Sequence, residues 1–272
     1  MNFAALKRRL MRLIENNRSG AGALENRLSD IFISGASGLS RREFRSLVEL
    51  SLSWQPPMAN ILNLISFARR KLDSDYSNLP RLLENRLMAI EKERQRLYRL
   101  AGRRIAFCKT IATISHSTAV EESVRAAVEF GWRGKMLIPE SRPAMEGRAL
   151  AARLSRFPIK VEFGVDTLIL SRLEEAEAAF VGADLVTKTH FVNKIGTSLL
   201  VRLLPPGKPL FVLADSSKFW RKRIPRIPSM PSAEIWNAGV EKVNILNRYF
   251  EIMPLSNRIR IICPKQSAPS FE

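Results

Sequence analysis

The sequence has only two cysteines and two histidines among its 272 residues. Cys108 and Cys263 each lie in an apolar run typical of a strand, so we expect two buried free thiols, with a disulfide as the less favoured alternative. Cys-x-x-Cys pairs are absent, and two histidines are too few to build a structural zinc site. We therefore expect neither a metal ion nor another cofactor.

Long apolar runs are also missing. No stretch of about 18 apolar residues occurs, so we expect neither a membrane span nor a membrane partner. The N-terminal "MNFAALKRRLMRLIENN" is amphipathic and basic but lacks the apolar core of a secretory signal, and Glu15 argues against a transit peptide. We expect a cytoplasmic protein.

Acidic residues are scarce: 26 Asp and Glu against 44 Lys and Arg give a net charge of +18. Residues 1–104 hold 20 basic and 10 acidic side chains and the rest hold 24 and 16, so the excess is spread over the chain. Such a charge favours a polyanion partner such as RNA, because basic side chains neutralise phosphates. The alternative, a basic surface that is merely solvated, stays open because no aromatic RNA-binding motif accompanies the charge.

The first part of the chain repeats apolar residues at spacings of three and four in five segments, which predicts five helices. Glycine and proline separate the segments, as in Ser19-Gly20-Ala21-Gly22, Ser34-Gly35 with Gly38, Pro56-Pro57 and Leu79-Pro80. We interpret residues 1–102 as a helical N-terminal domain.

From residue 103 the pattern changes to short apolar runs that alternate with helical segments. The runs "IAFCKTIATI", "KMLIPE", "IKVEFGVD", "AAFVGAD" and "PLFVLAD" predict strands, and a last strand, "RIRIICP", follows a basic, proline-rich loop. The alternation predicts the α/β fold class, with the helical N-terminal domain followed by a Rossmann-like, doubly wound parallel sheet over residues 103–272.

Polar residues follow the predicted strands, and ligands bind outside the carboxyl ends of the strands in an open parallel sheet. We interpret Asp166 as a helix N-cap, whereas Asp184 lies nine residues before the helix expected at Asn193. The strand ends carry Ser115-His116-Ser117, Glu140-Ser141-Arg142, Asp166, Asp184 and Asp215.

The stretch "TISHSTAVEES" supports two hypotheses. A Ser-His nucleophile pair is disfavoured, because His116 and Ser117 point to opposite sides of an extended chain and no GxSxG motif is present. We favour a strand-to-helix loop whose hydroxyl and N–H groups, from Ser115 to Ser117, hold an anion at the N-terminus of a helix that starts near Thr118. Plain N-capping by Ser117 or Thr118 is the alternative.

Two cations also qualify as ligand-binding residues. Arg142 would grip a phosphate with two prongs or pair with a carboxylate. Lys194 is expected in the first turn of a helix, where the helix dipole disfavours a cation, and this indicates a ligand-facing role or else a solvated lysine. The glycines around Gly20 and Ala21 permit close approach of the backbone to a ligand.

The stretches "TISHSTAV", "PESRPAMEGRALA", "VGADLV", "FVNKIGTSLL" and "PLFVLADSSKF", in this order and spacing, resemble the initiation factor 2B alpha/beta/delta family. That family also contains ribose-1,5-bisphosphate isomerase and methylthioribose-1-phosphate isomerase. The stretches "SGAGAL", "QPPMANILNL" and "EIWNAG" extend the resemblance to nearly the whole chain. The resemblance implies a helical N-terminal domain, a Rossmann-like C-terminal domain that forms a dimer, and a sugar-phosphate or nucleotide-phosphate pocket between them.

The resemblance also implies roles for single residues. In the family's isomerases a cysteine and an aspartate carry an aldose–ketose isomerisation, and these positions hold Ser117 and Asp184 here. With the candidates above, the expected ligand-binding residues are Gly20, Ala21, Ser115, His116, Arg142, Asn193, Lys194 and Lys218.

The sequence departs from the family pattern mostly at positions that the resemblance assigns to proton transfer. A serine hydroxyl at Ser117 is a far weaker acid than a thiol, whose pKa is about 8.5. Ser19 replaces the usual arginine before the N-terminal Gly-Ala, and Thr189-His190 replaces the usual Asn-Gly after the aspartate. The sequence therefore keeps more of the binding half of the site than of its catalytic half.

We expect a regulatory, non-catalytic protein that resembles initiation factor 2B. It would form a homodimer, bind a phosphorylated sugar or nucleotide, and have RNA or a translation factor as a further partner. The alternative is an aldose–ketose isomerase of a phosphorylated pentose such as ribose 1,5-bisphosphate, using Asp184 with His116 or His190. A third hypothesis is a basic RNA-binding scaffold with a vestigial pocket.

Overall fold

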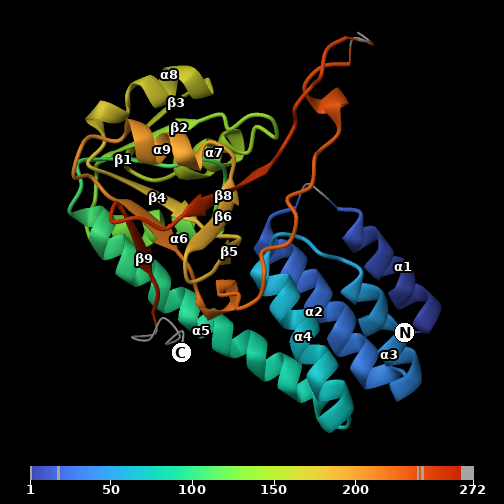
Figure 1. Cartoon of the computed structure of the whole chain (residues 1–272). Coiled ribbons are helices and arrows are strands. Elements are labelled where there is room, and N and C mark those ends of the chain that lie inside the picture. Colours follow the sequence, from blue (N-terminus) through green and yellow to red (C-terminus); the bar gives the residue numbers. More distant parts are fainter. Residues whose placement is uncertain (1, 17–18, 238, 240–241, 265–272) are drawn as a thin grey trace.

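A bundle of helices forms one end of the molecule, a layered α/β unit forms the other, and the long helix α5 runs along both (Figure 1). The computed structural model describes residues 2–16, 19–237, 239 and 242–264. The five helices expected in the first part are confirmed as α1 (Phe3–Ile14), α2 (Ala21–Gly38), α3 (Arg41–Leu52), α4 (Ala59–Ser74) and α5 (Leu79–Ala106).

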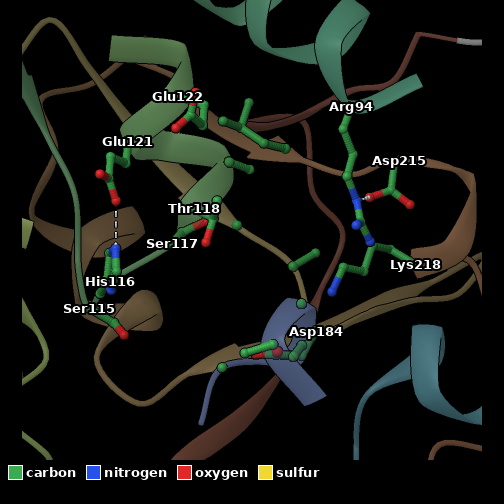
Figure 2. Close-up of a pocket in the computed structure, with 18 of the residues that line it drawn as sticks. Arg94, Ser115, His116, Ser117, Thr118, Glu121, Glu122, Asp184, Asp215 and Lys218 are labelled. Atoms are coloured by element: carbon green, nitrogen blue, oxygen red, sulfur yellow. Dashed lines mark hydrogen bonds and ion pairs between the residues drawn. The ribbon is translucent and has the colours of Figure 1, made fainter. Parts of the chain in front are cut away.

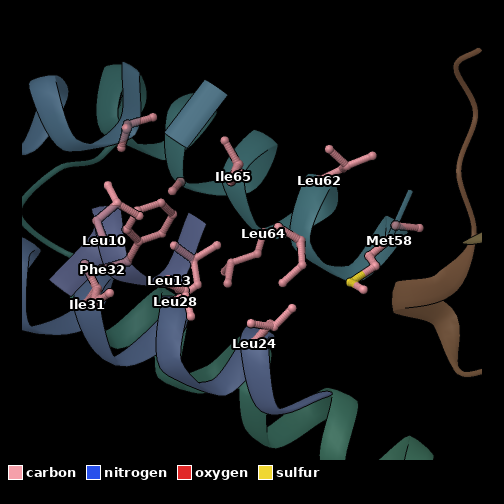
Figure 3. Packing of buried hydrophobic residues seen from close by; sticks show 14 of the residues in the cluster. Leu10, Leu13, Leu24, Leu28, Ile31, Phe32, Met58, Leu62, Leu64 and Ile65 are labelled. Atoms are coloured by element: carbon pink, nitrogen blue, oxygen red, sulfur yellow. The ribbon is translucent and has the colours of Figure 1, made fainter. Parts of the chain in front are cut away.

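The helical bundle is held by one apolar core, to which each helix contributes the face predicted by its three-and-four spacing. Helix α3 starts with a capping box, in which Ser40 and Glu43 bond each other's backbone N–H groups. Helix α2 ends at Gly38, one of the glycines expected to end it, whereas Gly35 packs against the ring of Phe44 inside the bundle. The core includes Leu10, Leu13, Leu24, Leu28, Ile31, Phe32, Met58, Leu62, Leu64 and Ile65 (Figure 3).

Helix α5 continues past the expected boundary at residue 102, and the strand expected over "IAFCKTIATI" shortens to β1 (Thr110–Ala112). Ile105 is fully buried on the helix face that packs against the sheet, which extends the helix. Cys108 follows the end of the helix instead of lying in a strand. Cys108 and Cys263 form no disulfide, and both are half-buried, so the prediction that they are buried was wrong.

The second part contains a six-stranded, all-parallel sheet in the order β3-β2-β1-β4-β7-β9, which confirms the doubly wound topology. The order reverses between β1 and β4, and this switch point is where open parallel sheets bind ligands. The other strands are β2 (Lys135–Pro139), β3 (Lys160–Gly164), β4 (Ala178–Gly182), β7 (Leu210–Leu213) and β9 (Ile259–Ile262).

Helices cover both faces of this sheet. Alternate strand residues enter two separate cores: Ala178 and Phe180 of β4 face one core, while Ala179 and Val181 face the other. The first core is closed by α5 together with α6 (Thr118–Glu129) and α7 (Gly147–Leu154). The second is closed by α8 (Asp166–Ser171) and α9 (Thr197–Leu203).

A second, antiparallel sheet was not expected from the sequence. It has the order β5-β6-β8, from β5 (Leu185–Val186), β6 (His190–Lys194) and β8 (Phe250–Pro254). The expectation that Asn193 and Lys194 open a helix was therefore wrong: both end strand β6, and α9 starts only at Thr197. Gly196 makes the turn between them with a φ of 95°, a conformation that favours glycine.

Helix α4 joins the helical bundle to the carboxyl edge of the sheet. The N–H of Ala59 donates to the carbonyl of Asp184 at 2.8 Å. The Asn63 amide donates to the carbonyls of Ser217 and Phe219 at 2.8 and 3.0 Å. These bonds place the first turn of α4 against the loops that follow β4 and β7.

Candidate functional site

A cavity of about 650 Å³ lies at the switch point, between the helical bundle and the carboxyl ends of β1, β4 and β7. Figure 2 shows side chains from the loop after β1, from α5 and from the loops after β4 and β7 facing this space. A volume of this size suits a small organic ligand. The cavity is lined by nine of the ten predicted site residues: Gly20, Ala21, Ser115, His116, Ser117, Asp184, Asn193, Lys194 and Lys218.

The loop after β1 is held in a fixed shape. Ser115 has a φ of 64°, and its N–H donates to the Ser141 hydroxyl at 2.7 Å. Ser117 is the N-cap residue of α6, but its hydroxyl makes no capping bond. A side chain at Gly182 of β4 would collide with that hydroxyl, since a Cβ there would lie 2.4 Å from the Ser117 Oγ. Glycine at the end of β4 therefore lets the two loops meet.

The Ser-His nucleophile pair is disfavoured by the geometry of His116. Its Nε2 lies 2.8 Å from the Glu121 carboxylate, whose other oxygen lies 3.4 Å from Arg153. The ring of His116 therefore contacts Glu121 of α6 and not Ser117. His190, the other histidine considered, starts strand β6 and is not among the residues that line the cavity.

Lys194 reaches the cavity from strand β6 and is enclosed by counter-charge and aromatic rings. Its ammonium lies 2.7 Å from a carboxylate oxygen of Glu146, whose other oxygen accepts from the Ser115 hydroxyl at 2.8 Å. The same ammonium lies 4.7 and 4.8 Å from the ring centres of Tyr249 and Phe250. Lys194 is therefore a positioned cation and not a freely solvated one.

Asp184 lies at the floor of the cavity and is half-buried. Burial raises its pKa, and the charges of Lys218 and Lys194 offset part of this rise. Its backbone is fixed on both sides, by Val192 of β6 at 2.9 Å and by Ala59 of α4. A carboxyl group with a raised pKa in a cavity is a candidate proton donor or acceptor.

Arg94 of α5 is a charged residue of the cavity that the sequence did not reveal. It pairs with Glu25 of α2 and, at 3.1 Å, with Asp215 after β7. Burial would raise the pKa of Asp215, but the charges of Arg94 and Lys218 outweigh it and hold this pKa below its usual range. One signal existed: Glu25 is an acid on the apolar face of a predicted helix, and such a position requires a buried partner.

The N-terminus of α2 also opens onto the cavity. Gly20 is the N-cap residue, no side chain caps this end, and Ser19 to Ala23 line the space. The Asn60 amide donates to the carbonyl of Ala21 at 2.8 Å, which fixes the first turn against α4. The cavity thus meets the positive ends of two helices, α2 and α6.

Arg142 is the predicted site residue that lies outside the cavity. It is exposed and borders a small adjoining depression that shares Ser115, Glu146 and Lys194 with the cavity. Its N–H donates to Asp166 at 2.8 Å. Asp166 does not cap its own helix as expected: it is the first residue of α8, and its carboxylate holds the loop of Ser141 and Arg142.

Two further findings concern the described part of the chain. No group of three or more His, Cys, Asp and Glu side chains there is arranged to hold a metal ion. No described helix is both long and apolar enough to cross a bilayer.

Comparison with known proteins agrees with the fold. The model of the Initiation factor 2 subunit family matches residues 15–263. The chain is 27% identical over 259 residues to a translation initiation factor eIF-2B subunit 2-like protein of Pyrococcus furiosus, covering 92% of each chain. It is 26% identical over 188 residues to ribose 1,5-bisphosphate isomerase of Archaeoglobus fulgidus, covering 67% of this chain and 60% of that enzyme.

A solved structure extends the likeness to three dimensions. The Pyrococcus horikoshii translation initiation factor eIF-2B superposes with a TM-score of 0.78 at 26% identity, over 96% of this chain and 95% of that one. With the family model matching most of its length, the chain belongs to the Initiation factor 2 subunit family.

Proposed function

We propose that the cavity binds a small phosphorylated sugar or nucleotide and that the protein acts as a regulatory, non-catalytic member of its family. One observation carries this proposal: the N-termini of α2 and α6 open onto the same cavity as the side chains of Lys194 and Lys218. Free N–H groups at a helix N-terminus together with nearby ammonium groups form a site for phosphate.

The non-catalytic part of the proposal depends on Ser117. Moving a proton between neighbouring sugar carbons needs a group that gives and takes a proton near neutral pH. Asp184 has a raised pKa and meets this need on one side. A serine hydroxyl does not meet it on the other side, and His116 is held by Glu121.

Ligand-induced stabilisation tests the binding proposal, with ribose 1,5-bisphosphate as the probe. At a concentration of about 100 times Kd a ligand stabilises the fold by about 2.7 kcal/mol, which raises Tm by roughly 5 to 10 °C for a chain of this size. The double variant Lys194→Met with Lys218→Met should lose this shift. The control Lys109→Met removes an exposed lysine next to the amino end of β1, at the edge opposite the cavity, and should keep the shift.

Phosphorus NMR of the same mixture separates binding from catalysis. Broadened ligand resonances without a new signal over hours would support the regulatory proposal. Sharp and unchanged resonances would contradict binding of this ligand. A shift in Tm retained by the double variant would contradict the assigned cavity.

The second candidate function is an aldose–ketose isomerase, and the raised pKa of Asp184 favours it. For this function a new ketose-phosphate resonance would appear and would be lost in Asp184→Asn. Ser117→Cys would raise the rate, because a thiolate is accessible near neutral pH. A rate unaffected by either substitution would contradict this mechanism.

The assembly is also part of the proposal: we infer a homodimer with a translation factor as its protein partner. The relative named as a subunit 2-like protein of translation initiation factor eIF-2B supports a partner of that kind. Light scattering on the purified protein should give a mass near twice 30.8 kDa. A mass of one chain would contradict the dimer without affecting the cavity.

A further inference from the structure

The outer face of helix α5 carries a row of cations that the cavity does not use. Arg81, Lys92, Arg96, Arg99 and Arg103 are all exposed. At 100° per residue they lie within an arc of about 60°, and at 1.5 Å per residue they span about 33 Å. The structure therefore presents a straight basic stripe along the outside of the molecule, where α5 passes both the bundle and the sheet (Figure 1).

No acid interrupts this stripe. Asn85 is the other residue on this arc, Met88 lies about 20° outside it, and both are exposed. Among the described residues, none of the five cations forms an ion pair. The stripe thus keeps its full charge toward the solvent, unlike Lys194 and Arg94 in the cavity.

Exposed aromatic rings accompany the cations at one end of the stripe. Arg99 and Arg103 lie 5.9 and 5.7 Å from the ring centre of Phe130, which ends α6. Phe107, four residues beyond Arg103 at the C-cap of α5, is 87% exposed. An apolar ring with so little burial gains nothing from the fold of the chain and is available to a partner.

We propose that this face of α5 binds single-stranded RNA, with the five cations on phosphates of one strand and Phe107 stacked on a base. The four cations from Lys92 to Arg103 follow one another at about 4.5 to 6 Å along the helix, and Arg81 lies about 16.5 Å before them. Phosphates also recur at short intervals along a strand, and aromatic rings beside a basic track are the features that bind single strands. An acidic protein surface would use the charges but gives no role to Phe107. This inference is independent of the phosphorylated ligand proposed for the cavity.

Fluorescence anisotropy with a labelled, mixed-sequence 20-nucleotide RNA tests the proposal. Five phosphate contacts predict that log K falls with log salt with a slope of about −3.5, at about −0.7 per contact. Changing Lys92, Arg96, Arg99 and Arg103 to Gln should leave a slope of about −0.7. Phe107→Ala should weaken binding about tenfold without changing the slope.

A matched control removes the same charge from exposed positions elsewhere. Changing Lys7, Arg8, Arg12 and Arg69 to Gln lowers the net charge by four but leaves α5 intact. This variant should keep the slope near −3.5, which separates a local surface from the overall charge. Thermal melting of both variants, compared with the unchanged protein, establishes that each is folded.

Several results would overturn the proposal. The wild-type protein could fail to bind the RNA in 50 mM salt, or the α5 variant could bind as tightly as the control variant. An affinity for polyglutamate equal to that for the RNA would show a general polyanion surface. Tighter binding of the same RNA in a duplex than as a single strand would exclude the stacking role of Phe107.

Discussion

The ion-pair cluster of Arg94, Glu25 and Asp215 gives the sharpest stability prediction. It joins three parts of the molecule: α5, α2 and the loop after β7. The side chain of Arg94 is 14% exposed, and those of Glu25 and Asp215 are 1% and 5% exposed. Replacing Arg94 with Met therefore leaves two buried carboxylates without their shared counter-charge.

The expected loss of stability is large for a single substitution. Removing one partner of a buried ion pair costs about 3 to 5 kcal/mol, which lowers Tm by roughly 6 to 20 °C for a chain of this size. Arg45→Met is the matched control, because Arg45 and Asp73 form a pair whose side chains are 45% and 56% exposed. An exposed pair contributes less than about 1 kcal/mol.

The sign of the pH dependence adds a second test. In the unchanged protein the depressed pKa of Asp215 contributes stability that is present above its unfolded pKa and is lost as pH falls toward the folded pKa. In Arg94→Met the burial of Asp215 should raise its pKa once the charge of Arg94 is gone, so the folded variant loses stability as pH rises through that pKa. The stability gap between the two proteins should therefore widen from about pH 4.5 to pH 8.

Urea denaturation followed by circular dichroism measures both effects. Adding Glu25→Gln and Asp215→Asn to Arg94→Met should recover part of the loss, because the unpaired charges are then removed. A loss in Arg94→Met no larger than that in Arg45→Met would refute the reasoning. A stability gap that stays constant with pH would refute the assigned cause.

Three further predictions concern single positions. Ser40→Ala removes the capping box with Glu43 and should lower the free energy of unfolding by about 1 kcal/mol, measured by urea denaturation; an unchanged midpoint would contradict it. Gly196 has a φ of 95°, and a Cβ added there would lie 2.4 Å from the Ile114 side chain, so Gly196→Ala should lower Tm by several degrees. An equal or higher Tm would contradict the assigned conformation of this turn. Burial raises the pKa of Tyr98 to about 12, so stability should fall as pH rises from about 10 toward 12, and Tyr98→Phe should reduce that fall in alkaline denaturation.

The periodic parts of the fold were predictable because each follows from neighbouring residues. The three-and-four spacing predicted all five N-terminal helices, and the alternating apolar runs predicted the six parallel strands. The antiparallel sheet was missed because β5 has only two residues and its pairing with β6 is closed by Thr187 and His190, with no glycine or proline at the turn. Its strands are stabilised by packing on two cores: Leu185 and Val192 belong to the bundle core, and Val186 and Phe191 belong to a core of the parallel sheet.

The sequence predicted which strand-end residues line the candidate site, but not the residues that they contact. The rule that parallel strands end at one edge brought Ser115, Ser117 and Asp184 together correctly. It could not place Lys194, whose strand pairs with distant β8, or exclude Arg142, whose loop is turned outward by its bonds to Asp166.

The sequence by itself determined the fold class and the edge that carries the cavity, since both depend on local periodicity or on a strand's end. The tertiary structure alone decided which charges are neutralised. Glu25, Arg94 and Asp215 are far apart in the chain and meet only when α2, α5 and β7 pack together. Coulomb interactions depend on distance and burial, which the order of residues does not contain.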